Sequence, residues 1–264
     1  MKNTNRFTTV ESNPHPVSHL LLTPLQGKSV PSLTTRLIFS FILLLSTSAI
    51  SLYGSTTEGT STEQRAVSGF NAIDIEGAFK VVLVQGATEG ITIEADPNAM
   101  TNIITKVEGN TLKINTKDNK SHKGEMSLTI NFKSLKSIDC SGSINLSSTG
   151  PLKFDDFSFE SSGSSKTNLE LSATKLSFEI SGAGNATLKG SASDVDLDIS
   201  GSGKYVASEL TANNYDIDIS GSGNAEISVS QNLDIDVSGS GTVKYKGDPK
   251  IKQDISGAGK IEKI

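Results

Sequence analysis

The dipeptide Ser-Gly returns at a nearly constant spacing through the second half of this 264-residue chain, and this period constrains the fold more than any other feature. Successive copies are separated by 21, 19, 19, 20, 18 and 18 residues, counted from the serines Ser141, Ser162, Ser181, Ser200, Ser220, Ser238 and Ser256. The last five copies have the full pattern S-G-[SA]-G. A period of about 19 residues is typical of a protein whose repeat units bury their apolar faces by stacking on one another.

Apolar and polar residues alternate before each motif, as in "VDLDI" ahead of Ser200 and "YDIDI" ahead of Ser220. This alternation predicts a strand with one buried face, and a shorter alternating segment follows each motif. The glycines between the two segments predict a sharp corner with positive φ. In the last unit, the inward positions are predicted to be Ile251 and Ile255. Cys140 falls at the buried position that Ile180 occupies in a later unit.

The predicted fold is all-β: a parallel β-helix, or solenoid, with repeats of about 19 residues. Residues 66–135 are also rich in alternating and β-branched segments, and they predict a less regular β region that begins the solenoid. Within that region, Pro97 after Asp96 predicts one short helix or turn. We expect a single domain over residues 66–264, a linker over 55–65 and a leader over 1–54.

The leader contains the apolar run "LIFSFILLL" at residues 37–45, which follows Arg36 and precedes small residues. This pattern is typical of an export signal, so we expect an exported protein of the periplasm, outer membrane or cell surface. The alternative is membrane anchoring through residues 37–52, although 16 residues that include four serines and a threonine are short for a spanning helix.

The chain carries 24 Lys and Arg against 29 Asp and Glu, a net charge of −5. Four of the basic residues and one acidic residue lie in the leader, which leaves the rest of the chain at −8. Such a charge disfavours nucleic acid and anionic membrane surfaces as partners. A single cysteine, Cys140, allows no internal disulfide bond.

The segment "FNAIDIEGAFKVVLVQG...ITIEAD", followed by tandem "DISGSG" repeats, resembles the putative auto-transporter adhesin head domain, or GIN domain, family found widely in Bacteroidota. The resemblance covers roughly residues 67–264. It implies an exported β-helical protein with an adhesin-like role, and it implies no defined catalytic residues. The chain departs from many exported proteins of such bacteria in having no lipid-attachment cysteine after its apolar run.

An acidic residue stands two places before the motif serine in all seven units. If the units stack in register, these residues form an outward column spaced by about 4.8 Å: Asp139, Glu160, Glu179, Asp198, Asp218, Asp236 and Asp254. A second, shorter column of ligand-face candidates consists of Asp196, Asp216 and Asp234, between Ser177 and Lys252. Like charges at this spacing repel each other, so something must offset the repulsion.

Two interpretations of the columns remain open. Divalent cations, with Ca²⁺ as the best candidate, could bridge carboxylates of adjacent units in a cation ladder at Asp198, Asp218, Asp236 and Asp254. Alternatively, the carboxylates could accept hydrogen bonds from serine hydroxyls or corner amides, with solvent screening the remaining charge. We favour the second interpretation, because a strand spreads alternate acids instead of wrapping them round one ion, and we expect no cofactor.

Catalytic signals are weak in this sequence. His122 is the one histidine after the leader, Cys140 fits a small core residue, and Tyr205, Tyr215 and Tyr245 fall at inward positions. We therefore expect a non-catalytic binding module whose partner is a glycan or a cell-surface protein. The alternatives are a structural envelope protein that self-associates as a homo-oligomer through an open end of the solenoid, and a polysaccharide hydrolase or lyase.

Overall fold

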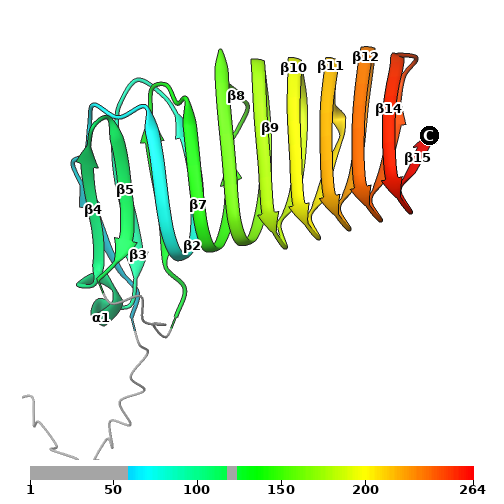
Figure 1. The fold of residues 1–264 in the computed structure, drawn as a ribbon. Helices are drawn as coiled ribbons and strands as arrows, with labels where there is room; N and C mark the ends of the chain where they lie inside the picture. The colour runs from blue at the N-terminus through cyan, green and yellow to red at the C-terminus, as the bar shows by residue number, and fades with distance from the viewer. Residues whose placement is uncertain (1–58, 118–123) are drawn as a thin grey trace, which may run out of the picture. The chain divides into compact units, whose positions relative to one another are not determined.

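The repeat units form parallel strands that stand side by side in one row (Figure 1). The structure is a computed structural model that describes residues 59–117 and 124–264, all of which belong to one compact unit. The predicted parallel β-solenoid with a less regular N-terminal β region is confirmed. The predicted leader, including the apolar run and residues 37–52, lies outside the described residues, as does His122.

The strands of the solenoid are separated at the later corners: five of them end at the first glycine of an S-G-[SA]-G motif, and the next strand begins directly after the second glycine. These strands are β7 (Ser137–Ser148), β8 (Leu152–Lys153), β9 (Asp156–Gly182), β10 (Asn185–Gly201), β11 (Lys204–Gly221), β12 (Asn224–Gly239), β13 (Thr242–Lys246), β14 (Lys250–Gly257) and β15 (Lys260–Lys263). Each pairs in parallel with the equivalent segment of the next unit, so that Ile199 lies opposite Ile219 and Gly201 lies opposite Gly221. The repeat period therefore sets the register directly.

Strand alternation decides which side chains enter the solenoid. On β10, Val195, Leu197 and Ile199 are at most 2% exposed, while the aspartates between them point to solvent. Burying one such side chain contributes about 1.5–3 kcal/mol, and equivalent residues stack on one another in columns along the unit. The predicted position of Cys140 is confirmed: it lies in the column of Ile75 and is 4% exposed.

The two glycines of each motif are required for different reasons. The first has positive φ, for example +132° at Gly201, and a β-carbon there would lie 2.6 Å from the carbonyl oxygen of Gly182 in the unit before. The second has no positive φ, but a β-carbon on Gly203 would lie 2.8 Å from Cγ2 of Ile180. The corner therefore needs one glycine for backbone conformation and one for close packing on the isoleucine column.

The N-terminal region begins the solenoid with β2 (Ala72–Gln85), which pairs in parallel with β7 and places Gly77 opposite Gly142. The region also contains β3 (Gly90–Ala95), α1 (Pro97–Met100), β4 (Ile103–Glu108), β5 (Thr111–Thr116) and β6 (Ser127–Phe132). The predicted short helix after Asp96 is confirmed, and the Asp96 side chain caps it by accepting a hydrogen bond from the Asn98 N–H at 2.8 Å.

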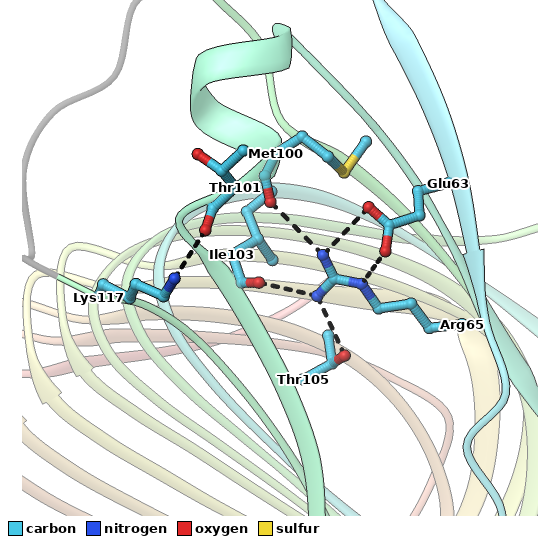
Figure 2. Close-up of polar contacts among 7 residues, drawn as sticks. All are labelled: Glu63, Arg65, Met100, Thr101, Ile103, Thr105 and Lys117. Carbon is cyan, nitrogen blue, oxygen red and sulfur yellow. Dashed lines mark hydrogen bonds and ion pairs between the residues drawn. The ribbon is translucent and has the colours of Figure 1, made fainter.

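Part of the predicted linker is a strand, so that prediction is wrong for residues 61–65. They form β1 (Ser61–Arg65), which pairs antiparallel with β3. The sequence "STEQR" has no apolar residue to reveal a strand, and its partner lies 30 residues away. Figure 2 shows what anchors it: Arg65 donates to the carbonyl oxygens of Met100 and Ile103, to Thr105 Oγ1 and to the Glu63 carboxylate.

The inward residues of the last unit are not buried, which corrects the prediction for Ile251 and Ile255. They are 42% and 37% exposed, respectively. β14 pairs with β12 on one side and with no other strand of the described chain. Burial at these positions needs a neighbouring unit on both sides, and β14 has one.

Over residues 59–117 and 124–264, no helix has the length and apolar character needed to cross a membrane.

Candidate functional site

The predicted acidic column exists, and its members lie opposite one another on neighbouring strands. Asp218 lies between Asp198 and Asp236, and Asp254 follows in the last unit. Toward the N-terminus the column continues through Glu179, and a further part joins Asp139 to Glu160. The alternation of the strands turns all of these side chains outward.

The column begins one unit earlier than the sequence analysis placed it. Asp74 on β2 lies opposite Asp139 on β7, in the same register that aligns Gly77 with Gly142. The missed signal is "IDIEG" at residues 73–77, which has the spacing of the later "IDISG" segments with Glu in place of Ser. This unit lacks the Ser-Gly pair that marks the later ones, because Glu76 precedes Gly77.

The second predicted column is also present. Asp196 lies opposite Asp216, and Asp216 lies opposite Asp234; Ser177 and Lys252 stand at its two ends as expected. Lysines neutralise the outer two members: Lys175 Nζ lies 3.1 Å from Asp196 Oδ2, and Lys252 Nζ lies 2.7 Å from Asp234 Oδ2. Asp216, in the middle, has no such partner among the described residues.

A third column lies beside these two, and the sequence analysis did not identify it. Asp194, Asn214 and Asn232 lie opposite one another on successive strands. Asn214 Nδ2 donates to Asp194 Oδ1 and Asn232 Nδ2 donates to Asn214 Oδ1, both at 2.7 Å. The signal in the sequence is a polar residue two places before each member of the second column.

Together the three columns form an outward surface on β10, β11 and β12, which we call the acidic face. It consists of Asp194, Asp196, Asp198, Asn214, Asp216, Asp218, Asn232, Asp234 and Asp236. Neighbouring strands in a sheet are about 4.8 Å apart, so the carboxylates within a column are close enough to interact.

The acidic face raises the pKa of several of its own carboxyl groups. Desolvation is the largest cause for Asp216, and the carboxylates of Asp218, Asp234 and Asp196 add to it. For Asp218, desolvation again comes first, followed by Asp236 and Asp198. The pKa of Asp198 is raised by desolvation and by Glu179. The negative charge on this surface is therefore costly in the free protein.

The expected hydrogen bonds to the first column are largely missing. Ser181 Oγ donates to Glu179 Oε1 at 3.2 Å, as that interpretation requires. No described residue donates a hydrogen bond to the carboxylates of Asp198, Asp218 or Asp236. Their acceptor oxygens are open to solvent and to an external partner.

The described residues provide no preformed coordination site for the predicted cation ladder. Within the part of the chain that the structure describes, no group of three or more His, Cys, Asp or Glu side chains is arranged to hold a metal ion. Calcium needs six to eight oxygen ligands, and a flat column offers each ion few of them. The ladder at Asp198, Asp218, Asp236 and Asp254 stays a prediction.

A groove of about 690 Å³ lies next to the acidic face. Phe154 and Phe157, which stack with ring centroids 4.1 Å apart, line it together with Lys136, Lys153 and Lys175. Lys175 is shared with the acidic face through its ion pair with Asp196. The sequence did not predict the groove, because residues 153–158, which line it, depart from the repeat pattern.

Gln85 holds that wall in place through the backbone of β8. The Lys153 N–H donates to Gln85 Oε1 at 2.7 Å, and Gln85 Nε2 donates to the Lys153 carbonyl oxygen at 2.9 Å. The side-chain amide thus pairs with β8 as a neighbouring strand would. It fixes a short strand that has few backbone partners of its own.

Neither the cysteine nor the inward tyrosines have the setting of a catalytic group. Burial raises the pKa of the Cys140 thiol to about 12, so it stays protonated and is a poor nucleophile. Tyr205 and Tyr215 are 0% and 2% exposed, as the sequence predicted, and burial raises the pKa of both. Tyr245 is partly buried.

Comparison with known families finds one that covers most of the described chain. The family model described as "Putative auto-transporter adhesin, head GIN domain" matches residues 69–249. The match includes β2, with the early rung at Asp74, and all three strands of the acidic face. Comparison with curated proteins finds no match.

Solved structures from Bacteroidota share the fold. A crystal structure described as a putative adhesin from Bacteroides fragilis NCTC 9343 has a TM-score of 0.73 and 26% identity, covering 79% of this chain and 98% of that one. A putative adhesin from Parabacteroides merdae ATCC 43184 has a TM-score of 0.63 and 26% identity, covering 78% and 96%. One from Parabacteroides distasonis ATCC 8503 has a TM-score of 0.64 and 25% identity, covering 78% and 97%.

Proposed function

The chain belongs to the putative auto-transporter adhesin, head GIN domain family, and from this premise we propose that it is a non-catalytic binding module of the bacterial surface or periplasm. Export through the apolar run at residues 37–45 would bring it there. The adhesin description of the family and of its solved relatives supports this class of function over a polysaccharide hydrolase or lyase.

The observation that carries the proposal is the set of open carboxylates on the acidic face. Asp198, Asp218 and Asp236 receive no hydrogen bond from the described residues, and the pKa of Asp218 is raised by desolvation and by its acidic neighbours. A partner that supplies positive charge would remove this repulsion on binding. Relief of this repulsion would therefore contribute to the free energy of binding.

The partner that fits best is a protein surface rich in lysine and arginine. The acidic face spans three neighbouring strands, which suits a protein better than a small molecule held in a cleft. The acidic face consists of Asp and Asn side chains and offers no ring on which a sugar would stack, while Phe154 and Phe157 in the neighbouring groove are at most 8% exposed. A glycan is therefore the alternative ligand, and nucleic acid is disfavoured by the charge.

Binding of the full chain to immobilised poly-L-lysine and to a panel of neutral glycans tests the proposal. The variant Asp216→Asn, Asp218→Asn, Asp234→Asn, Asp236→Asn removes four charges from the acidic face. A matched control removes four charges elsewhere through Glu94→Gln, Glu125→Gln, Glu170→Gln and Glu209→Gln. We expect saturable binding to poly-L-lysine that is lost in the first variant and kept in the control.

Equal loss in both variants would mean that net charge alone drives the binding, and the proposed site would be wrong. Saturable binding to a neutral glycan that survives in the first variant would move the site off the acidic face. Repeating the measurement with EDTA and then with Ca²⁺ tests the cation ladder at the same time. Tighter binding with Ca²⁺ than with Mg²⁺ at equal ionic strength would establish a calcium-dependent site.

A structural role in the envelope is the second candidate function. One observation favours it: the exposed edge and apolar side chains of β14.

A further inference from the structure

The exposed large apolar side chains of the described chain gather at one end of the solenoid. They are Ile251 and Ile255 on β14, and Ile264 after β15, at 42%, 37% and 50% exposure. At the other end of the unit, β1 and β3–β6 cover the first rung, and the apolar side chains of β3–β6 are buried or partly buried. The two ends therefore differ, and at the end formed by β14 and β15 no other described strand covers these apolar side chains.

The backbone of β14 is open along the same edge. β14 pairs with β12 from Lys250 to Gly257, and no other described strand lies on its outer side. Every second residue of a strand points its N–H and C=O away from a given neighbour, so a row of donors and acceptors faces outward here. An open strand edge of this kind is a template for pairing with another strand.

The sequence of β14 is complementary to itself when it is read in opposite directions. In "KIKQDISG", an antiparallel pair centred on Gln253 places Ile251 opposite Ile255 of the other copy and Lys252 opposite Asp254. Gln253 meets Gln253. Inward residues meet inward residues and outward residues meet outward residues, because the opposed positions differ by an even number.

Neighbouring registers that keep the same faces are unfavourable. Moving the centre to Lys252 brings two lysines together, and moving it to Asp254 brings two aspartates together. Like charges that are directly opposite in an antiparallel pair are destabilising, whereas opposite charges and apolar pairs stabilise. The composition of β14 thus favours one register over the registers on either side of it.

We propose that β14 is a self-association edge through which two copies of the chain join tail to tail in a two-fold dimer. β14 of each copy pairs antiparallel with β14 of the other, centred on Gln253. The pairing satisfies the open backbone groups and makes the two cores continuous through Ile251 and Ile255. It also surrounds Lys252 with acids, since Asp234 lies on its other side at 2.7 Å. This inference does not depend on the binding role of the acidic face.

Cysteine substitutions in the full chain test both the dimer and its register. In the proposed pairing, the two Gln253 positions are directly opposite, with Cα atoms about 4.5–5.5 Å apart, which is within reach of a disulfide bond. The Cα atoms of the two copies of residue 251 are about 14 Å apart, because each lies opposite residue 255, four residues further along the strand. The native thiol of Cys140 is buried and does not compete.

We expect Gln253→Cys to form a disulfide-linked dimer under mild oxidation. Ile251→Cys alone should not crosslink, whereas a mixture of Ile251→Cys and Ile255→Cys chains should. Sedimentation should show a concentration-dependent dimer for the unmodified chain and a shift to monomer for Ile255→Asp, at a position that is 37% exposed in the single chain. A monomer at every concentration up to the solubility limit, or equal crosslinking from positions 251 and 253, would overturn the proposal.

Discussion

The side chains of Asp218 and Asp236 lie opposite each other on β11 and β12, and no described residue donates a hydrogen bond or forms an ion pair with either. Parallel strands at about 4.8 Å keep the two charges close. The outward surface of the solenoid therefore opposes the folding that its buried isoleucines drive. The first prediction measures this cost.

Replacement of Asp218 by Asn should stabilise the protein at neutral pH by up to about 1 kcal/mol at low salt. The pKa of Asp218 is raised in the fold, mainly by desolvation and then by Asp236 and Asp198. A raised pKa favours the folded state below the ordinary Asp value of about 3.9, and this contribution is lost as the pH rises through the folded pKa. Urea unfolding at neutral and acidic pH checks the change.

The advantage of Asp218→Asn should shrink toward pH 3, where the wild-type carboxyl group is protonated. Added salt should also reduce it, because salt screens repulsion between exposed charges. Asp248→Asn is the control, since Asp248 pairs with Lys263 and lies outside the columns. A variant that is less stable than the wild type at neutral pH would contradict the repulsion argument.

The two glycines of one corner should differ in what they tolerate. Gly201→Ala forces a β-carbon toward a backbone oxygen and places alanine at a φ of +132°. Gly203→Ala meets side-chain methyl groups of Ile180 and Ile199, which can move slightly. We expect Gly201→Ala to cost roughly 3 kcal/mol or more and Gly203→Ala roughly 1–3 kcal/mol.

Chemical denaturation of both variants measures the order of these costs. Gly86→Ala serves as the control, because a β-carbon there has no neighbour within 4 Å. Equal losses at positions 201 and 203 would show that packing alone, and not backbone conformation, determines the corner.

Tyr215→Phe should stabilise the fold, which is unusual for a substitution in a core. The hydroxyl oxygens of Tyr215 and Tyr205 are buried, lie close enough for each to affect the pKa of the other, and make no hydrogen bond of good geometry with a described residue. A buried polar group without a partner costs about 1–3 kcal/mol, so removing it should raise the free energy of unfolding by roughly 1 kcal/mol. Thermal and urea unfolding measure the gain, with Tyr245→Phe as a partly buried comparison. A loss of stability would mean that the two hydroxyls bond to each other.

Arg65 should decide whether β1 stays attached to the rest of the unit. Its guanidinium group holds two carbonyl oxygens, one hydroxyl and one carboxylate, and a lysine cannot reproduce this geometry. We expect Arg65→Lys to speed amide hydrogen exchange in residues 61–65 while leaving the exchange of β10–β12 unchanged. Lys80→Ala, which breaks an exposed pair with Glu125, should change neither. Unchanged exchange in β1 would show that backbone pairing with β3 suffices.

The repeat unit predicted the position of many side chains in this protein, because stacking in register copies one local pattern along the solenoid. Once Asp198 is outward and Ile199 inward in one unit, Asp218 and Ile219 follow in the next. The acidic columns, their ends at Ser177 and Lys252, and the buried place of Cys140 all follow from that rule. So does the need for glycine at Gly201.

What the period does not encode had to come from the tertiary structure. The strand at residues 61–65, the groove beside Phe154 and Phe157, and the exposure of Ile251 depend on which distant segments meet, and local alternation carries no information about that. The sequence alone determined the direction of each side chain, because a strand alternates with a period of two. The tertiary structure decided which of those side chains have a partner, because partners lie on neighbouring strands and local alternation does not show which strands are neighbours.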